Sequence, residues 1–216
     1  MITELRRLKN RARRDATRQR LIEVAKKIFA EKGYHNTIVS DIVKGAGVGQ
    51  GTFYRNFKDK RDIFENLLNE LTEKLLSSFS DMSSELPQNS NEYREASIRA
   101  IKRMINIVVA NKELVKIYIK EAITVDKELE NKIYEFQIRF AQLAKYYLDH
   151  AIEKGFARRC NSDIVSKSIV GLGFSLLNMW LGGIIKEEDV DDIITEVIDF
   201  AFFGLVGSVN PKGVEL

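Results

Sequence analysis

The stretch Thr37–Phe57, TIVSDIVKGAGVGQGTFYRNF, restricts the possible folds of this chain more than any other segment. It predicts two short helices joined by a tight turn. The first helix has an apolar stripe at spacing i, i+1, i+4, formed by Ile42, Val43 and Ala46. Thr37 is a candidate N-cap, because its hydroxyl can accept a hydrogen bond from a free N–H of the first turn. Gly45 and Gly47 are expected to end the helix, since glycine accepts a positive φ.

The second helix of this segment is expected to bury Phe53 and Phe57, which lie one turn apart. Five polar side chains would then face outward: Gln50, Thr52, Tyr54, Arg55 and Asn56. In a helix-turn-helix, the second helix enters the DNA major groove while the first crosses the phosphate backbone. Gln50 can pair with adenine and Arg55 with guanine. Gly51 would let the helix backbone come close to the groove, because glycine has no Cβ.

Several short motifs occur together in and after this segment: Ala46-Gly47-Val48, Gly51-Thr52-Phe53-Tyr54, Phe57, Lys58, Lys60 and Asp62-Ile63-Phe64. With this spacing, Leu21–Leu68 resembles the DNA-binding domain of the TetR family of transcriptional regulators. The resemblance implies an all-helical homodimer, in which a small molecule bound in the larger C-terminal domain regulates the helix-turn-helix. It also implies phosphate contacts for Tyr54 and Lys60, and DNA contacts for Arg55 and Asn56.

Two positions depart from the family pattern. Gly49 stands where the family usually has Ser or Thr, so the capping and phosphate-binding hydroxyl is missing. Ile38 stands where a second Thr or Ser is common. Thr37 remains the candidate for a phosphate contact at the start of the first helix. The alternative explanation for the whole segment is an ordinary helical hairpin with a solvated polar face.

The formal net charge of +3 hides a strong separation along the chain. Residues 1–61 hold 16 Lys/Arg and 6 Asp/Glu, a net charge of +10, whereas the remainder holds 18 and 25, a net charge of −7. A basic head favours binding of a polyanion at one end only. Residues 1–14 carry six basic side chains and one acid. They are expected to form an arm or a helical extension that contacts phosphate or the minor groove, or else a solvated disordered tail.

Apolar periodicity predicts an all-α fold. The expected helices cover residues 15–32, 59–83, 92–110, 112–123, 127–154, 163–181 and 189–206, in addition to the helix-turn-helix. We expect a DNA-binding domain over residues 1–60, including the basic arm 1–14, and a C-terminal regulatory and dimerisation domain over residues 61–216. The helix at 59–83 would connect the two and could transmit a shift between them.

A small hydrophobic effector is expected in the C-terminal domain, such as an aromatic molecule or an acyl chain. The candidate lining residues are Met104, Ile107, Tyr118, Phe136, Phe140, Phe174 and Trp180. For any one of them the alternative is plain core packing, which is the commoner role of a buried aromatic residue.

The two C-terminal helices carry more apolar surface than one fold needs. The helix at 163–181 is apolar on nearly every face, and the one at 189–206 has a second apolar surface. This pattern predicts an isologous four-helix interface in a homodimer. The alternative is a monomer in which other helices cover both. Because the first of the two contains Asp163, Lys167 and Asn178, a buried helix is favoured over a membrane span.

The function that these features favour is a sequence-specific DNA-binding regulator, a ligand-released dimeric repressor on a palindromic double-stranded operator. The alternative is a non-specific, nucleoid-type nucleic-acid-binding protein. The sequence shows no nucleophile elbow, phosphate-binding glycine loop or paired His/Cys spacing, so we expect no enzyme activity, cofactor or metal site. A lone Cys160 and the absence of an apolar leader favour the cytoplasm.

Overall fold

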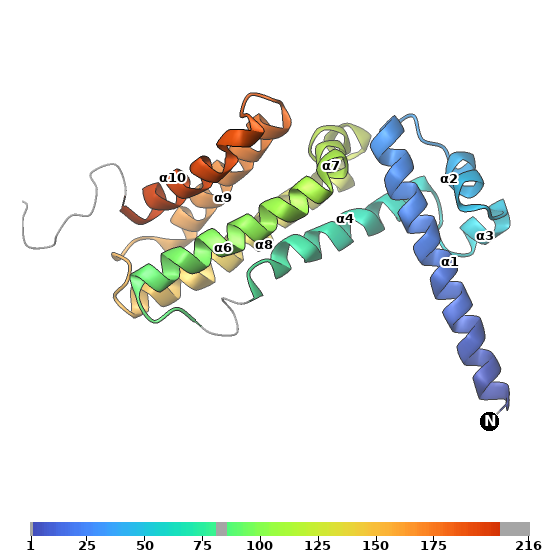
Figure 1. Ribbon diagram of the computed structural model, residues 1–216, viewed down its shortest axis with the longest axis horizontal. Coiled ribbons are helices and arrows are strands. Elements are labelled where there is room, and N and C mark those ends of the chain that lie inside the picture. The colour runs from blue at the N-terminus through green and yellow to red at the C-terminus, as the bar shows by residue number, and fades with distance from the viewer. Residues whose placement is uncertain (1, 81–85, 204–216) are drawn as a thin grey trace, which may run out of the picture. The chain divides into compact units, whose positions relative to one another are not determined.

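Every element that the structure describes is helical, which confirms the all-α prediction (Figure 1). The computed structural model describes residues 2–80 and 86–203, with backbone only at residues 2–3 and 121–125. The elements are α1 (Ile2–Lys32), α2 (Val39–Ala46), α3 (Gln50–Tyr54), α4 (Lys60–Ser77), α6 (Ser90–Ala110), α7 (Lys112–Val125), α8 (Lys127–Glu153), α9 (Ser162–Leu181), the 3₁₀ helix η1 (Glu187–Asp189) and α10 (Val190–Phe203).

The predicted ends of the middle helices agree with α6 to α9 to within two residues. The predicted helix at 59–83 was too long, because α4 ends at Ser77. There the backbone tightens, and the N–H of Ser78 donates to the carbonyl of Leu75. The carbonyl of Ser78 accepts two hydrogen bonds from the Arg103 guanidinium, at 2.6 and 2.9 Å, instead of one from a following helical turn. The predicted ends at Ser83 and Val206 lie outside the described residues.

The chain divides into two compact units. The first compact unit consists of Met1–Glu73 and Glu113–Glu130, and so contains α1, α2, α3, most of α4 and α7. Within it, α1 packs against α2 and α2 against α3. Its core is aromatic, with side chains no more than 2% exposed at Phe29, Phe53, Phe57 and Phe64. The predicted domain boundary at residue 60 stays a prediction.

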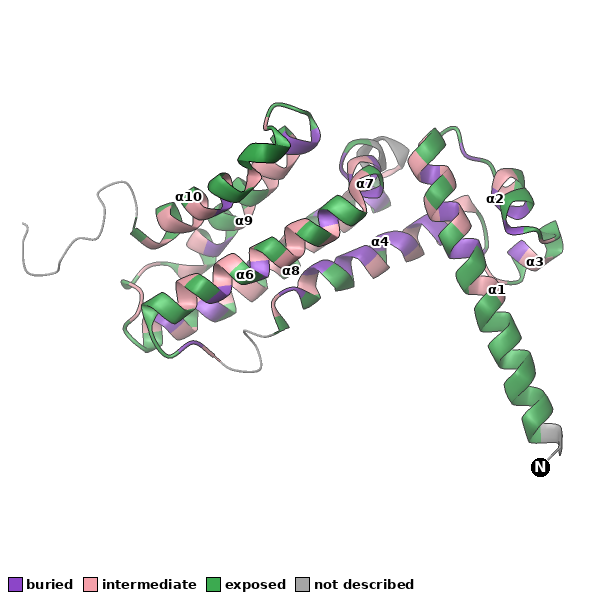
Figure 2. Ribbon diagram, in the orientation of Figure 1, coloured by how far each residue is buried: buried purple, intermediate pink, exposed green. Residues whose placement is uncertain are grey.

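The basic N-terminus is helical from Ile2 onward, so the segment is an extension of α1 (Figure 2). The side chains of residues 4–16 are all exposed. This stretch lacks tertiary contacts that would explain its helicity, but it is rich in Arg, Lys, Leu and Ala and contains no Gly or Pro. Of the two alternatives, the structure therefore agrees with the helical extension and not with the disordered tail.

The second compact unit consists of Lys74–Lys112 and Asn131–Leu216. Ala96 and Ala100 of α6 pack on Tyr147 of α8, whose hydroxyl donates to the carbonyl of Phe79 at 3.2 Å. A bidentate ion pair between Arg94 and Asp199, with nitrogen–oxygen distances of 2.5 and 2.9 Å, ties α6 to α10.

Helices α9 and α10 leave apolar side chains exposed in the single chain. The exposed residues are Ile164, Ile169, Leu172, Met179, Phe200 and Phe203. The other described helices of the single chain therefore do not cover this surface, contrary to the alternative of a monomer. In the described part of the chain, α9 is also the one helix long and apolar enough to cross a membrane, a test that helices of soluble proteins also pass.

Candidate nucleic-acid interface

The turn between α2 and α3 is set by glycine. Gly47 adopts a φ of 61°, the left-handed conformation that ends α2, and its N–H donates to the carbonyl of Lys44 at 3.2 Å. Gly49 is the N-cap of α3, and no side chain caps that helix end. The predicted role of Gly47 is therefore confirmed, and the missing hydroxyl at Gly49 leaves the start of α3 with backbone hydrogen bonds alone.

Gly45 does not end α2, contrary to the prediction, since it lies inside the helix. A Cβ built at this position would lie 2.8 Å from Cγ1 of Val24 and 3.4 Å from Cδ1 of Ile28, both in α1. Gly45 therefore permits the close approach of α1 and α2 that holds the helix-turn-helix in place.

Thr37 is not the N-cap of α2, because Ile38 occupies that position. The Thr37 side chain is fully buried, and its hydroxyl donates to the carbonyl of Gly33 at 2.7 Å. A hydroxyl without accessible surface cannot reach a phosphate, so the structure removes Thr37 from the candidate contacts. The first turn is capped instead by Asp41, whose carboxylate accepts from the N–H of Ile38 at 3.3 Å.

Asp41 also binds Lys32 of α1 at 3.0 Å. The hydrogen bond from Lys32, followed by the one from the Ile38 backbone, holds the pKa of the Asp41 carboxyl below its ordinary value. The carboxylate is therefore charged at neutral pH, and it fixes the start of α2 against the end of α1.

Helix α3 presents a polar face over an aromatic core. Phe53 is fully buried and Phe57 is 2% exposed, as predicted. Four of the predicted contact positions are exposed and two are half-buried: Gln50, Gly51, Tyr54 and Arg55, then Thr52 and Asn56. Nothing lies within 4 Å of a Cβ placed at Gly51, so the backbone there is open to a partner.

Two of these polar side chains are held by Thr52. The Arg55 guanidinium donates to the Thr52 hydroxyl at 2.9 Å, so its position over the exposed face is fixed in advance. The Asn56 amide donates to the Thr52 carbonyl at 2.7 Å, which satisfies a free carbonyl at the end of α3. Asn56 therefore has a structural role as well as its predicted contact.

Lys60 lies at the first position of α4 and is bound within the first compact unit. Its ammonium donates to the carbonyl of Tyr34 at 2.7 Å and to that of His35 at 3.4 Å. It also lies 4.3 Å from the centre of the Tyr34 ring. Lys60 thus joins the α1–α2 loop to α4, and its predicted phosphate contact stays a prediction.

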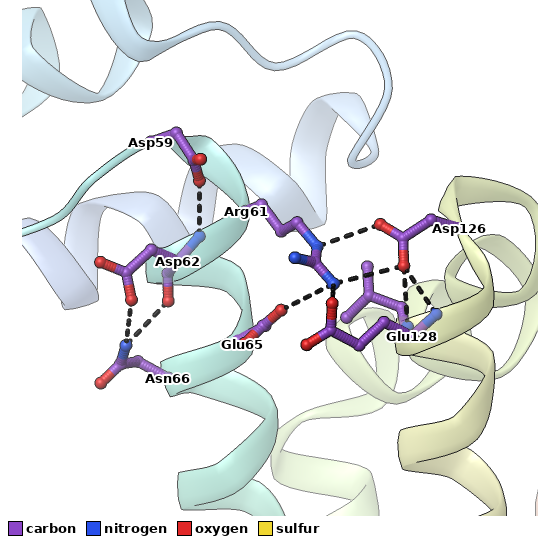
Figure 3. A network of polar contacts seen from close by, with 8 residues as sticks. Asp59, Arg61, Asp62, Glu65, Asn66, Asp126 and Glu128 are labelled. Atoms are coloured by element: carbon purple, nitrogen blue, oxygen red, sulfur yellow. Dashed lines mark hydrogen bonds and ion pairs between the residues drawn. The ribbon is translucent and has the colours of Figure 1, made fainter.

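The first turn of α4 is joined to the start of α8 by Arg61, as Figure 3 shows. The guanidinium lies 3.0 Å from Asp126 and 2.8 Å from Glu128, and 3.2 Å from Glu65 on α4 itself. Asp126 in turn caps α8, accepting from the N–H groups of Glu128 and Leu129. The hydrogen bond from Leu129, and then the charge of Arg61, lower the pKa of Asp126.

Sequence reasoning missed this Arg61 cluster. Asp126 and Glu128 are 65 and 67 residues from Arg61 along the chain. No local pattern marks acids at a helix start as the partners of a particular arginine. The only available signal was an excess of acids at the start of the predicted helix at 127–154.

Comparisons with known proteins agree with this geometry. Residues 21–67, which include α2, α3 and the start of α4, match the bacterial regulatory proteins of the tetR family. This part of the chain is therefore of the TetR-family type. An HTH-type transcriptional regulator of Staphylococcus aureus is 49% identical over 53 residues. That match covers 24% of this chain, which spans only 29% of the relative's length.

Solved structures extend the TetR-family likeness over most of the chain. A TetR-family regulator from Syntrophomonas wolfei is 25% identical, with a TM-score of 0.74 over 91% of this chain and 98% of its own. The transcriptional regulator FadR from Bacillus subtilis, in complex with stearoyl-CoA, is 24% identical, with a TM-score of 0.71 over 87% and 98%. At 24% identity, the similarity to FadR is evidence for the fold alone.

The predicted ligand-lining residues are distributed over both compact units, and their role stays a prediction. Tyr118 is buried on α7 in the first compact unit, whereas the other six belong to the second. Phe136 and Phe140 pack together, with ring centres 5.0 Å apart, and Phe140 also contacts Phe79. Met104, Ile107 and Phe174 are half-buried. A cavity described in the second unit is lined by Trp180 and by none of the others.

Proposed function

We propose that this protein is a sequence-specific DNA-binding transcriptional regulator that inserts α3 into the major groove. The observation that carries this proposal is the exposed face of Gln50, Tyr54 and Arg55 above a fully buried Phe53. The family match supports it, and so does the net charge of +10 on residues 1–61. We assign base contacts to Gln50 and Arg55. Tyr54 is assigned a phosphate contact.

We further propose that the protein acts as a homodimeric repressor in the cytoplasm, joined through α9 and α10. Two α3 helices held at a fixed distance would recognise a palindromic operator. The apolar side chains exposed on α9 and α10 support this arrangement, because such a surface is normally covered. We expect no enzyme activity. No group of three or more His, Cys, Asp or Glu that could hold a metal occurs among the described residues.

Fluorescence anisotropy with DNA from upstream of the gene, and with a scrambled duplex of equal length, tests the proposal. Gln50→Ala should weaken binding to the specific duplex by roughly tenfold or more, because a bidentate base contact is worth about 1–3 kcal/mol. It should leave the scrambled duplex unaffected. Tyr54→Phe should weaken both duplexes by a similar factor, since a phosphate contact carries no sequence information.

The chain offers matched controls for both substitutions. Gln142→Ala alters an exposed glutamine of α8, and Tyr146→Phe alters a tyrosine that is 54% exposed, close to the 56% of Tyr54. Neither should change DNA affinity. Equal affinity of the unmodified protein for both duplexes, at every salt concentration, would favour the non-specific alternative. Unchanged binding by Gln50→Ala and Tyr54→Phe would remove α3 as the contact.

The effector that we propose is a small hydrophobic molecule with an acyl chain. FadR from Bacillus subtilis, which shares the fold, was crystallised in complex with stearoyl-CoA, so that compound is the first probe. Added to the protein–DNA complex, it should lower operator affinity by about 5–150-fold, the usual range of coupling between two sites. Binding of stearoyl-CoA without any change in operator affinity would contradict release by this ligand.

A further inference from the structure

A cavity of about 180 Å³ lies in the second compact unit and is partly open to solvent. Its apolar wall is formed by Ile105 and Val109 of α6, Trp180 of α9 and Val190 of α10, and its rim is formed by Glu187, Glu188 and Asp191. The Trp180 side chain is only 5% exposed, and its indole nitrogen has no hydrogen-bond partner among the described residues. The cavity is separate from the aromatic cluster of Phe79, Phe136 and Phe140.

A cation of the protein itself already contacts two residues of the cavity lining, Trp180 and Glu187. The ammonium of Lys112 is 5.2 Å from the centre of the Trp180 ring and 3.3 Å from the carboxylate of Glu187. An aromatic face beside a carboxylate is the arrangement by which proteins recognise organic ammonium groups. The side chains of Lys112 and Glu187 are 36% and 66% exposed, so their ion pair holds Lys112 only weakly and the ammonium can withdraw.

The charge around the rim also favours a positively charged ligand. Residues 186–192, KEEDVDD, contain five acids and one lysine. Lys186 pairs with Glu188 at 3.3 Å, and Lys102 of α6 pairs with Asp191 at 3.0 Å. Each of the three rim acids thus has one lysine partner, and the excess of negative charge in this segment comes from Asp189 and Asp192, which do not line the cavity. When the Lys112 ammonium withdraws, Glu187 loses this partner and the rim carries one net negative charge, which favours a cation over a carboxylate or a phosphate.

We propose that this cavity binds an organic ammonium compound with a short apolar tail. The ammonium takes the place of Lys112 over the Trp180 ring, beside Glu187. The tail packs against Ile105, Val109 and Val190. The cavity is close in size to the roughly 150 Å³ that accommodates benzene, so a tail of about six carbons fits. This site is independent of the DNA-binding function and of the acyl effector proposed above.

Trp180 is the only tryptophan of the chain, so its fluorescence reports on this cavity directly. The full-length protein is titrated with hexyltrimethylammonium, and in parallel with 1-hexanol and hexanoate, which carry the same tail with no charge or a negative one. We expect a saturable change with the cation at a midpoint at least roughly tenfold below that of the other two. No saturable change, or equal midpoints for the three compounds, would overturn the proposal.

Substitution of Lys112 separates a ligand site from an ordinary surface ion pair. Lys112→Ala removes the internal competitor, so hexyltrimethylammonium should bind more tightly, by about three- to tenfold. Glu187→Gln should weaken binding by a similar factor. Lys145→Ala is the matched control, because it removes an exposed lysine that pairs with Asp149 elsewhere in the same unit. It should change nothing.

The result with Lys112→Ala shows whether Lys112 and the ligand compete for the same position over the Trp180 ring. Weaker or unchanged binding of the cation by this variant would show that Lys112 does not occupy the ligand position. Should Lys112→Ala fail to fold, as judged by circular dichroism, Lys112→Gln provides the same comparison with most of the side-chain stem retained.

Discussion

The helix-turn-helix and the C-terminal helix pair differ in how completely each covers its apolar side chains. In and around the first, Phe29, Phe53 and Phe64 are fully buried, and the exposed face of α3 carries polar groups. In the second, Ile164, 60% exposed, and Phe200, 47% exposed, face solvent. The first region therefore has a complete apolar core, and its polar face is available to contact DNA. The second is complete only when another surface covers it.

The largest expected effect concerns the aromatic core of the first compact unit. Phe64→Ala should lower the free energy of unfolding by about 3–5 kcal/mol, because it leaves a cavity among packed rings. Phe200→Ala removes the same side chain from an exposed position of α10. Measured by urea denaturation at low protein concentration, it should cost less than about 1 kcal/mol. Similar losses for both variants would mean that the two regions do not differ as described.

A charge placed on the uncovered surface tests what covers it. Leu172→Glu on α9 should shift the protein from dimer to monomer, raising the dissociation constant by roughly a hundredfold or more, since burying an unpaired charge costs several kcal/mol. Sedimentation velocity measures the change. Lys154→Glu, an exposed substitution just after α8, should leave the dimer intact. A monomeric unmodified protein would refute the proposed interface.

The smallest expected effect concerns the Arg61 cluster, which joins α4 to the start of α8. The pKa of Asp126 is lowered from 3.8, so its carboxylate is favoured in the folded state. The resulting stability is present above pH 3.8 and is lost as the pH falls through the lower folded value. Asp126→Asn should therefore reduce stability at neutral pH by less than about 1 kcal/mol.

Thermal unfolding of the unmodified protein and of Asp126→Asn, at pH 7 and in acid below the ordinary pKa of 3.8, measures this difference. The gap between the two proteins should close in acid. A gap of constant size would mean that the carboxylate charge contributes nothing, and that the hydrogen bonds to Glu128 and Leu129 act alone.

The sequence by itself determined the features that depend on near neighbours. The apolar spacing predicted the helices, the burial of Phe53 and Phe57, and the outward direction of the polar groups between them. The positive φ of Gly47 could be predicted for the same reason, because a glycine at a helix end is a local signal.

Only the tertiary structure decided which polar groups are engaged inside the protein. Thr37 is buried, Lys60 is bound to carbonyls 25 and 26 residues away, and Arg61 pairs with acids 65 and 67 residues away. Gly45 is required by Val24 on another helix, not by its own turn. The physical reason is common to Gly45, Lys60 and Arg61, whereas the Thr37 hydroxyl bonds a carbonyl only four residues away. Helical periodicity fixes the face on which a side chain lies, but the partner on that face comes from how distant helices pack.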